Sequence, residues 1–101
     1  MIDKQLQNAI KNAALELCCG DQTLRGRLSC AVRRLDRFLG RREDWPAALY
    51  SRSQDISDEF KGFQSAESAI EAMQFSKVER LAERILHLYA DSNVQAASSE
   101  M

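Results

Sequence analysis

The sequence contains few residues that bend or interrupt a helix. A single proline and four glycines stand among 101 residues, and strand-like alternation of apolar and polar residues is missing. Because proline and glycine are the strongest local breakers of regular structure, their scarcity predicts long helices. The length suits one domain, and the composition of 45% apolar and 29% charged residues is typical of a globular chain.

Long hydrophobic runs are missing as well. The amino-terminal stretch MIDKQLQNAIKNAALELCC lacks the uninterrupted apolar region of a secretory signal. No later stretch approaches the roughly eighteen apolar residues of a membrane span. We therefore expect a soluble, cytoplasmic protein with reduced thiols. The cysteines, Cys18, Cys19 and Cys30, are odd in number, and their spacing fits neither a disulfide framework nor a zinc site, so we expect no metal.

Groups that carry catalysis are scarce. The chain has one histidine, His87, which the helical pattern directs away from the apolar side. A lone surface histidine is seldom a catalytic base, and no serine or cysteine motif accompanies it. Glycine-rich phosphate loops, paired histidines and dinucleotide-binding fingerprints are missing too. The sequence therefore predicts no enzyme, no catalytic residue and no cofactor.

Apolar residues recur at spacings of three and four, which predicts five helices. The first is expected over 3–19, the second over 22–40, the third from EDWPAALY (43–50) to about Gly62, the fourth over 65–73 and the fifth over 77–90. The short link between the first two requires an antiparallel hairpin or a helix-turn-helix crossing. We expect a compact all-α bundle of four to five helices with an amino-terminal helical hairpin, residues 1–90 forming one domain and 91–101 a flexible tail.

Several local signals indicate where these helices begin or lose their apolar face. Asp21 is expected to cap the second helix and Ser65 the fourth, because their side-chain oxygens can accept from free backbone N–H groups. The pattern SKVE (76–79) is typical of a capping box at the start of the fifth helix. In the third helix, Arg52 and Ser53 interrupt the apolar side.

The stretch LRGRLSCAVRRLDRFLGRR (24–42) places seven arginines among apolar residues. Residues 22–42 hold those seven arginines and one acid, a net charge of +6, whereas 43–72 hold seven acids and two bases, a net charge of −5. On a helical wheel the apolar side chains form one stripe and the arginines cover the outer surface. The candidate interaction surface comprises Arg27, Cys30, Arg33, Arg34, Arg37, Arg41, Trp45 and Tyr50, with Trp45 and Tyr50 expected to be exposed.

Two interpretations of the arginines remain open. Several guanidinium groups along one ridge could contact the phosphates of a duplex, and a helix-turn-helix would put Gln22, Thr23, Arg25 and Arg27 at its recognition end. Alternatively, the ridge faces the acidic segment, within one molecule or across a dimer. Asp55, Asp58 and Glu59 are the partners expected in that case. The near-neutral net charge and the acidic segment favour this second interpretation.

Cys30 also has two interpretations. Surrounding arginines would favour the reactive thiolate of a redox sensor. Otherwise Cys30 is a small residue at a contact surface, and Gly26, one turn earlier, would permit close approach there. We favour the interpretation of Cys30 as a small residue at a contact surface.

The sequence thus predicts a small non-catalytic protein-interaction or adaptor protein, of bacterial or mobile-element origin. A homodimer is an option, a nucleic-acid-binding regulator is the main alternative, and no membrane partner is expected.

Overall fold

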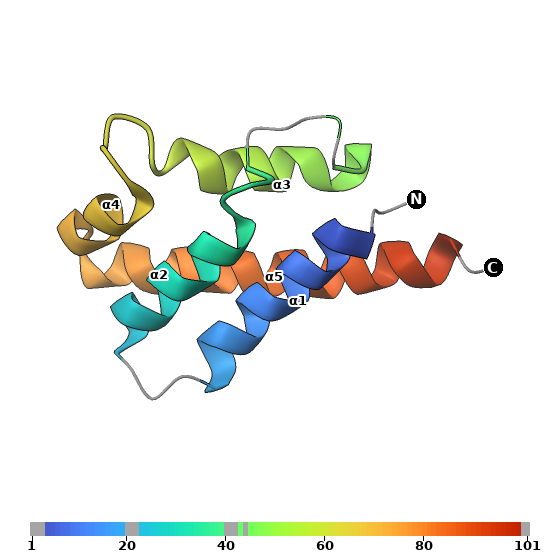
Figure 1. Ribbon diagram of the computed structural model, residues 1–101, viewed down its shortest axis with the longest axis horizontal. Helices are drawn as coiled ribbons and strands as arrows, with labels where there is room; N and C mark the ends of the chain where they lie inside the picture. Colours follow the sequence, from blue (N-terminus) through green and yellow to red (C-terminus); the bar gives the residue numbers. More distant parts are fainter. Residues whose placement is uncertain (1–3, 20–22, 40–42, 44, 100–101) are drawn as a thin grey trace.

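The first two helices of the computed structural model form an antiparallel hairpin (Figure 1). Helix α1 spans Lys4–Cys19 and helix α2 spans Leu24–Leu35. The structure describes residues 4–19, 23–39, 43 and 45–99, with side chains for these residues up to 94 except that of Cys19. Both helices pack along their lengths through the apolar stripes seen in the sequence, which confirms the predicted hairpin.

Helix α2 begins and ends at other residues than predicted. Its N-cap is Thr23, whose hydroxyl oxygen accepts a hydrogen bond of 3.2 Å from the backbone N–H of Gly26. The predicted cap, Asp21, lies outside the described residues, and the prediction was wrong because the helix starts three residues after it. At the other end, the N–H groups of Phe38 and Leu39 both donate to the Leu35 carbonyl, so the helix closes in a turn before residue 40.

Two shorter helices follow. Helix α3 spans Ala47–Asp58 and starts directly after Pro46, while helix α4 spans Ala66–Ala72. The Ser65 hydroxyl accepts from the backbone N–H of Ser68, which confirms the predicted cap of α4. Between them Gly62 has a φ of +87°, a left-handed conformation that favours glycine and reverses the chain.

Helix α5 spans Phe75–Ser99 and is the longest element. It begins before Ser76, so the predicted capping box at 76–79 was wrong; the N–H groups of Lys77 and Val78 instead donate to the Gln74 carbonyl. The helix also continues well past residue 90, through most of the segment predicted as a tail. Ser92 is fully buried there, and its hydroxyl donates to the Tyr89 carbonyl at 2.7 Å.

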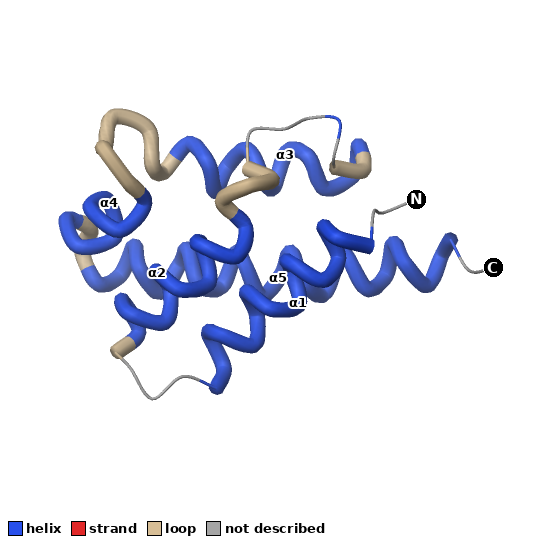
Figure 2. The backbone as a smooth tube through the Cα atoms, in the orientation of Figure 1, coloured by secondary structure: helices blue, strands red, loops and turns tan. Residues whose placement is uncertain are grey.

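The five helices enclose one apolar core, and no strand occurs in the part of the chain that the structure describes (Figure 2). The structure confirms an all-α bundle. Helices α1 and α2 pack against α5, and α3 lies along α5 in the opposite direction. The largest fully buried side chains are Leu6, Ile10, Leu28, Val32, Leu35, Leu49, Ile56, Ile70, Val78, Leu81, Ile85 and Leu88.

Helix α3 buries a residue that the sequence pattern excluded from the core. Ser53 is 1% exposed, and its hydroxyl donates to the Tyr50 carbonyl at 2.7 Å. Because the hydroxyl is satisfied within its own helix, a serine can occupy a core position at little cost. Beside it, Arg52 forms an ion pair of 2.9 Å with Asp91 of α5. The interruption predicted at residues 52 and 53 is therefore confined to Arg52.

Candidate interaction surface

Two arginines of α2 bind backbone carbonyls at the ends of neighbouring helices. The Arg27 guanidinium donates to the Leu17 carbonyl of α1 at 3.1 Å, and the Arg25 guanidinium donates to the Ile70 carbonyl of α4 at 2.6 Å. Carbonyls in the last turn of a helix stand at the negative end of its dipole, so cations are favourable there. Arg25 and Arg27 thus hold α2 against α4 and α1.

The next two arginines pair with carboxylates. Arg33 forms an ion pair with Glu67 of α4, and Arg34 forms one of 3.1 Å with Glu16 of α1. The hydrogen bond from Arg33 to Glu67, together with the charge of that carboxylate, raises the pKa of Arg33 above its ordinary value. Glu67 belongs to the acidic segment, so one pair joins the two charged segments within the molecule. The predicted cationic ridge is therefore partly neutralised by the chain itself.

The carboxylates expected to face the arginines of α2 have other partners. Asp58 pairs with Lys61 at 2.9 Å, and Glu59 pairs with Lys77 at 2.8 Å. The Lys61 hydrogen bond, followed by that of Gln54, holds the pKa of Asp58 below its ordinary value. Within one molecule Asp58 and Glu59 do not face α2, because Glu59, at the carboxyl-terminal end of α3, pairs with Lys77 and Arg84 of α5. A contact between the two charged segments across a dimer stays a prediction.

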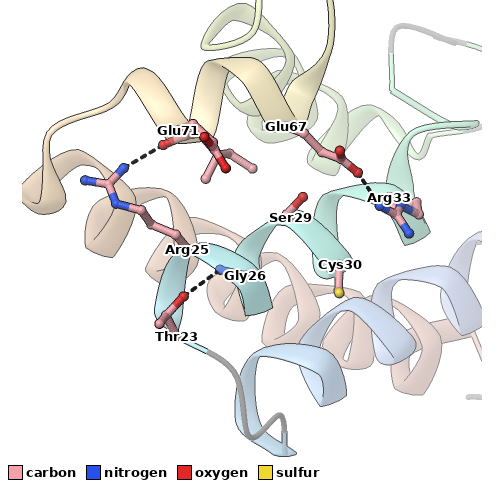
Figure 3. Close-up of a pocket in the computed structure, with 9 residues that line it drawn as sticks. Thr23, Arg25, Gly26, Ser29, Cys30, Arg33, Glu67 and Glu71 are labelled. Carbon is pink, nitrogen blue, oxygen red and sulfur yellow. Dashed lines mark hydrogen bonds and ion pairs between the residues drawn. The ribbon is translucent and has the colours of Figure 1, made fainter.

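A groove of about 500 Å³ lies between α2 and α4; we call it the α2–α4 groove (Figure 3). Its α2 side carries small residues between two arginines, and its α4 side carries two glutamates. The lining residues are Thr23, Arg25, Gly26, Ser29, Cys30, Arg33, Glu67, Ile70 and Glu71. Two basic and two acidic residues are among them, so the formal charge of the lining is balanced.

The remaining candidates from the sequence lie in different surroundings. Cys30 is half-buried with a free thiol and lines the α2–α4 groove near Arg33. Arg37 is exposed, with its guanidinium carbon 5.4 Å from the centroid of the Phe38 ring. Arg41 lies outside the described residues. The structure brings Cys30 and Arg33 into one groove and leaves Arg37 outside it; the redox role of Cys30 stays a prediction.

The expectation that Trp45 is exposed was wrong. Its side chain is 5% exposed and belongs to the core, while Tyr50 is half-buried against that core. The indole N–H of Trp45 donates to the Phe38 carbonyl at 2.8 Å. The aromatic side chains with exposed rings are instead Phe63 and Phe75. Trp45 therefore stabilises the core and is not part of the interaction surface.

A second hollowed region was missed by the sequence reasoning. It lies where α3 ends and α5 begins, and its cationic residues are Lys77, Arg80 and Arg84. Their spacing of three and four residues puts them on one face of a helix. This spacing could have indicated the cationic surface from the sequence. Next to them Phe63 lines a more apolar hollow.

Comparison with protein-family models, with curated proteins and with solved structures found no match. Within the described ranges, no helix is long and apolar enough to cross a membrane. No group of three or more histidine, cysteine, aspartate or glutamate side chains among the described residues is arranged to hold a metal ion.

Proposed function

We propose that this protein is a non-catalytic interaction or adaptor protein that binds the polar surface of another protein in its α2–α4 groove. The observation that carries the proposal is the mixed charge of that groove. Arg25 and Arg33 stand on one wall, and Glu67 and Glu71 on the other. Protein interfaces commonly match charges of both signs in this way, which selects the correct partner and suppresses others.

The same mixture argues against nucleic acid as the partner of this groove. A phosphate backbone is uniformly negative and gains affinity by displacing cations with lysine and arginine. Glu67 and Glu71 would repel it from the opposite wall, and the guanidinium groups of Arg25 and Arg33 already bind α4. A partner protein can instead offer a base to Glu71, which a phosphate backbone cannot.

The α2 side of the groove also suits a protein partner. Gly26, Ser29 and Cys30 are small, so they leave room for a side chain of the partner between α2 and α4. Arginine is enriched among the residues that dominate binding energy at interfaces, and Arg33 lines this groove.

We propose a reducing compartment such as the cytoplasm as the place of action, in keeping with the free thiols of Cys18 and Cys30.

Site-specific photo-crosslinking in cells of the source organism tests this proposal. A photoreactive amino acid at Ser29 probes the α2–α4 groove, and the same amino acid at Lys11, exposed on α1, is the matched control. We expect a crosslinked protein at position 29 that position 11 does not capture. The same pattern of crosslinks at both positions would contradict the proposal.

A binding measurement with the purified captured protein then tests the charge argument. We expect Glu71→Lys to raise the Kd about tenfold, roughly 1.4 kcal/mol, because the partner meets a charge of the wrong sign. Glu79→Lys makes the same change at an exposed position of α5 and should leave the Kd unchanged. Equal affinity of wild type and Glu71→Lys would exclude the groove as the binding surface.

A further inference from the structure

A hollow of about 340 Å³ follows the amino-terminal half of α5; we call it the cationic hollow. Lys77, Arg80 and Arg84 line it together with Gln74, Ser76, Leu81 and Glu59. Glu59 comes from the turn after α3, so the hollow joins the end of one helix to the beginning of another. It contains none of the residues that line the α2–α4 groove.

The charges in this hollow are unbalanced. Glu59 is its one acidic lining residue against three basic ones, a net charge of +2. Glu59 accepts from Lys77 at 2.8 Å and from Arg84 at 3.2 Å. These contacts, with the Lys77 hydrogen bond foremost, hold the pKa of Glu59 below its ordinary value, so the carboxylate stays ionised near neutral pH. The exposed side chain of Arg80 has no carboxylate partner among the described residues.

A second hollow of about 330 Å³ adjoins the first; we call it the apolar hollow. Its apolar lining consists of Phe63, Ala72 and Met73. The Phe63 side chain is 46% exposed, so much of its ring is open to solvent. The two hollows share Glu59, Gln74 and Lys77 in their walls, which makes them neighbouring parts of one surface.

We propose that these two hollows together bind an acidic peptide segment of a partner protein. An apolar side chain of the segment packs on Phe63 in the apolar hollow, while adjacent aspartate or glutamate side chains bind Arg80 and compete with Glu59 for Lys77 and Arg84. Charge-assisted hydrogen bonds from arginine to carboxylate are among the stronger ones in proteins. Aromatic residues are also enriched at protein interfaces, whose rims are polar. This site is distinct from the α2–α4 groove and gives the adaptor a second contact.

Selection from a phage library of random twelve-residue peptides, with the full chain immobilised, tests the proposal. We expect the selected peptides to share an apolar residue next to at least two acidic ones. The consensus peptide is then synthesised with a fluorescein label and titrated by fluorescence anisotropy. Binding should weaken with added salt, because exposed charges at such a site are screened.

Four variants identify the site. Arg80→Glu and Phe63→Ser should each raise the Kd of the consensus peptide about tenfold, since one reverses the free cation and the other removes the anchor. Lys11→Glu repeats the charge change on α1 and should leave the Kd within about twofold. Glu59→Gln should tighten binding, because it frees Lys77 and Arg84 for the peptide. If Glu59 only stabilised the fold, Glu59→Gln would not increase the affinity for the peptide.

Three results would overturn this inference. One is a selection without an acidic consensus, and another is unchanged affinity of the consensus peptide for Arg80→Glu. The third is displacement of the peptide by a single-stranded RNA oligonucleotide whose own binding is lost in Arg80→Glu. The ligand of this site would then be nucleic acid. Glu71→Lys distinguishes this site from the α2–α4 groove. It should weaken binding of the partner captured at Ser29 and leave binding of the peptide unchanged.

Discussion

The indole Nε1 of Trp45 donates a hydrogen bond to the carbonyl oxygen of Phe38, with 2.8 Å between the two atoms. The contact ties Trp45, two residues before α3, to the turn that ends α2. Both side chains are buried, so the connection between these helices is anchored in the core. A tryptophan that looks like an interface anchor in the sequence is therefore part of the packing.

Trp45→Phe should lower the free energy of unfolding by about 1–3 kcal/mol. The change removes the donor, leaves the Phe38 carbonyl without its partner and replaces the indole by a smaller ring. Urea unfolding followed by far-ultraviolet circular dichroism measures the loss. Phe75→Leu changes an aromatic residue that is 55% exposed and should cost less than about 0.5 kcal/mol. Equal unfolding midpoints for the two variants would contradict the structural role of Trp45.

Arg27→Ala should be destabilising although it removes a charge from a basic segment. The Leu17 carbonyl loses its donor at the end of α1, and the apolar part of the arginine side chain no longer covers its neighbours. We expect a loss of about 1–2 kcal/mol in urea unfolding. Arg80→Ala serves as the comparison and should stay within about 0.5 kcal/mol of wild type. If both variants unfold alike, Arg27 is an ordinary surface residue.

Ser53 should tolerate a smaller change and reject a larger one. Ser53→Ala removes a hydroxyl that bonds only the Tyr50 carbonyl of its own helix, so stability should change by less than about 0.5 kcal/mol. Ser53→Leu forces a larger, branched side chain into this buried position and should cost about 1–3 kcal/mol. Thermal unfolding of both variants measures the difference. A leucine variant more stable than wild type would show that the space around Ser53 is not filled.

The Glu59 contacts should make stability depend on pH. The pKa of Glu59 is lowered from its ordinary value of 4.5, chiefly by the Lys77 hydrogen bond. Its ionised form therefore stabilises the fold above a pH of about 4.5, and this stabilisation is lost as the pH falls through the lower folded-state pKa. The side chains of this pair are partly exposed to solvent, which screens their charges, so we expect at most about 1 kcal/mol near neutral pH.

The matched measurement compares wild type with Glu59→Gln across acidic and neutral pH. The difference in unfolding free energy should be largest near neutral pH and should vanish at the acidic end, because wild type then carries a neutral carboxyl as well. If the difference in unfolding free energy stays constant with pH, the charge of the Glu59 carboxylate does not stabilise the contact with Lys77 and Arg84.

The arginine segment should not confer nucleic-acid binding. Arg33 and Arg34 pair with carboxylates of α4 and α1, so their guanidinium groups are less available to phosphates. Titration of duplex DNA at two salt concentrations should therefore give no binding at micromolar protein. Micromolar binding that weakens steeply with salt and is lost in Arg33→Glu/Arg37→Glu would restore the nucleic-acid-binding regulator as the function.

Local patterns in the sequence were sufficient for the helical hairpin and most of the core. Apolar residues at helical spacing identify the buried side of a helix before its neighbours are known. The Ser65 cap was equally readable, because an N-cap depends on residues within one turn. Ser53 and Ser92 were not readable as core residues, because a hydropathy pattern treats serine as polar whether or not its hydroxyl bonds its own backbone.

The outer position of the arginines followed from the sequence, and their partners did not. Glu16 and Glu67 lie far from Arg34 and Arg33 along the chain, so only the packing of α1 and α4 against α2 joins them. The same holds for the cationic hollow, where Glu59 and Arg84 meet through the α3–α5 contact. Apart from residues 91–99, the sequence by itself determined which segments are helical and which sides of them are apolar, because these depend on local spacing. The tertiary structure decided which charges are neutralised and which stay free, because that depends on distances between helices.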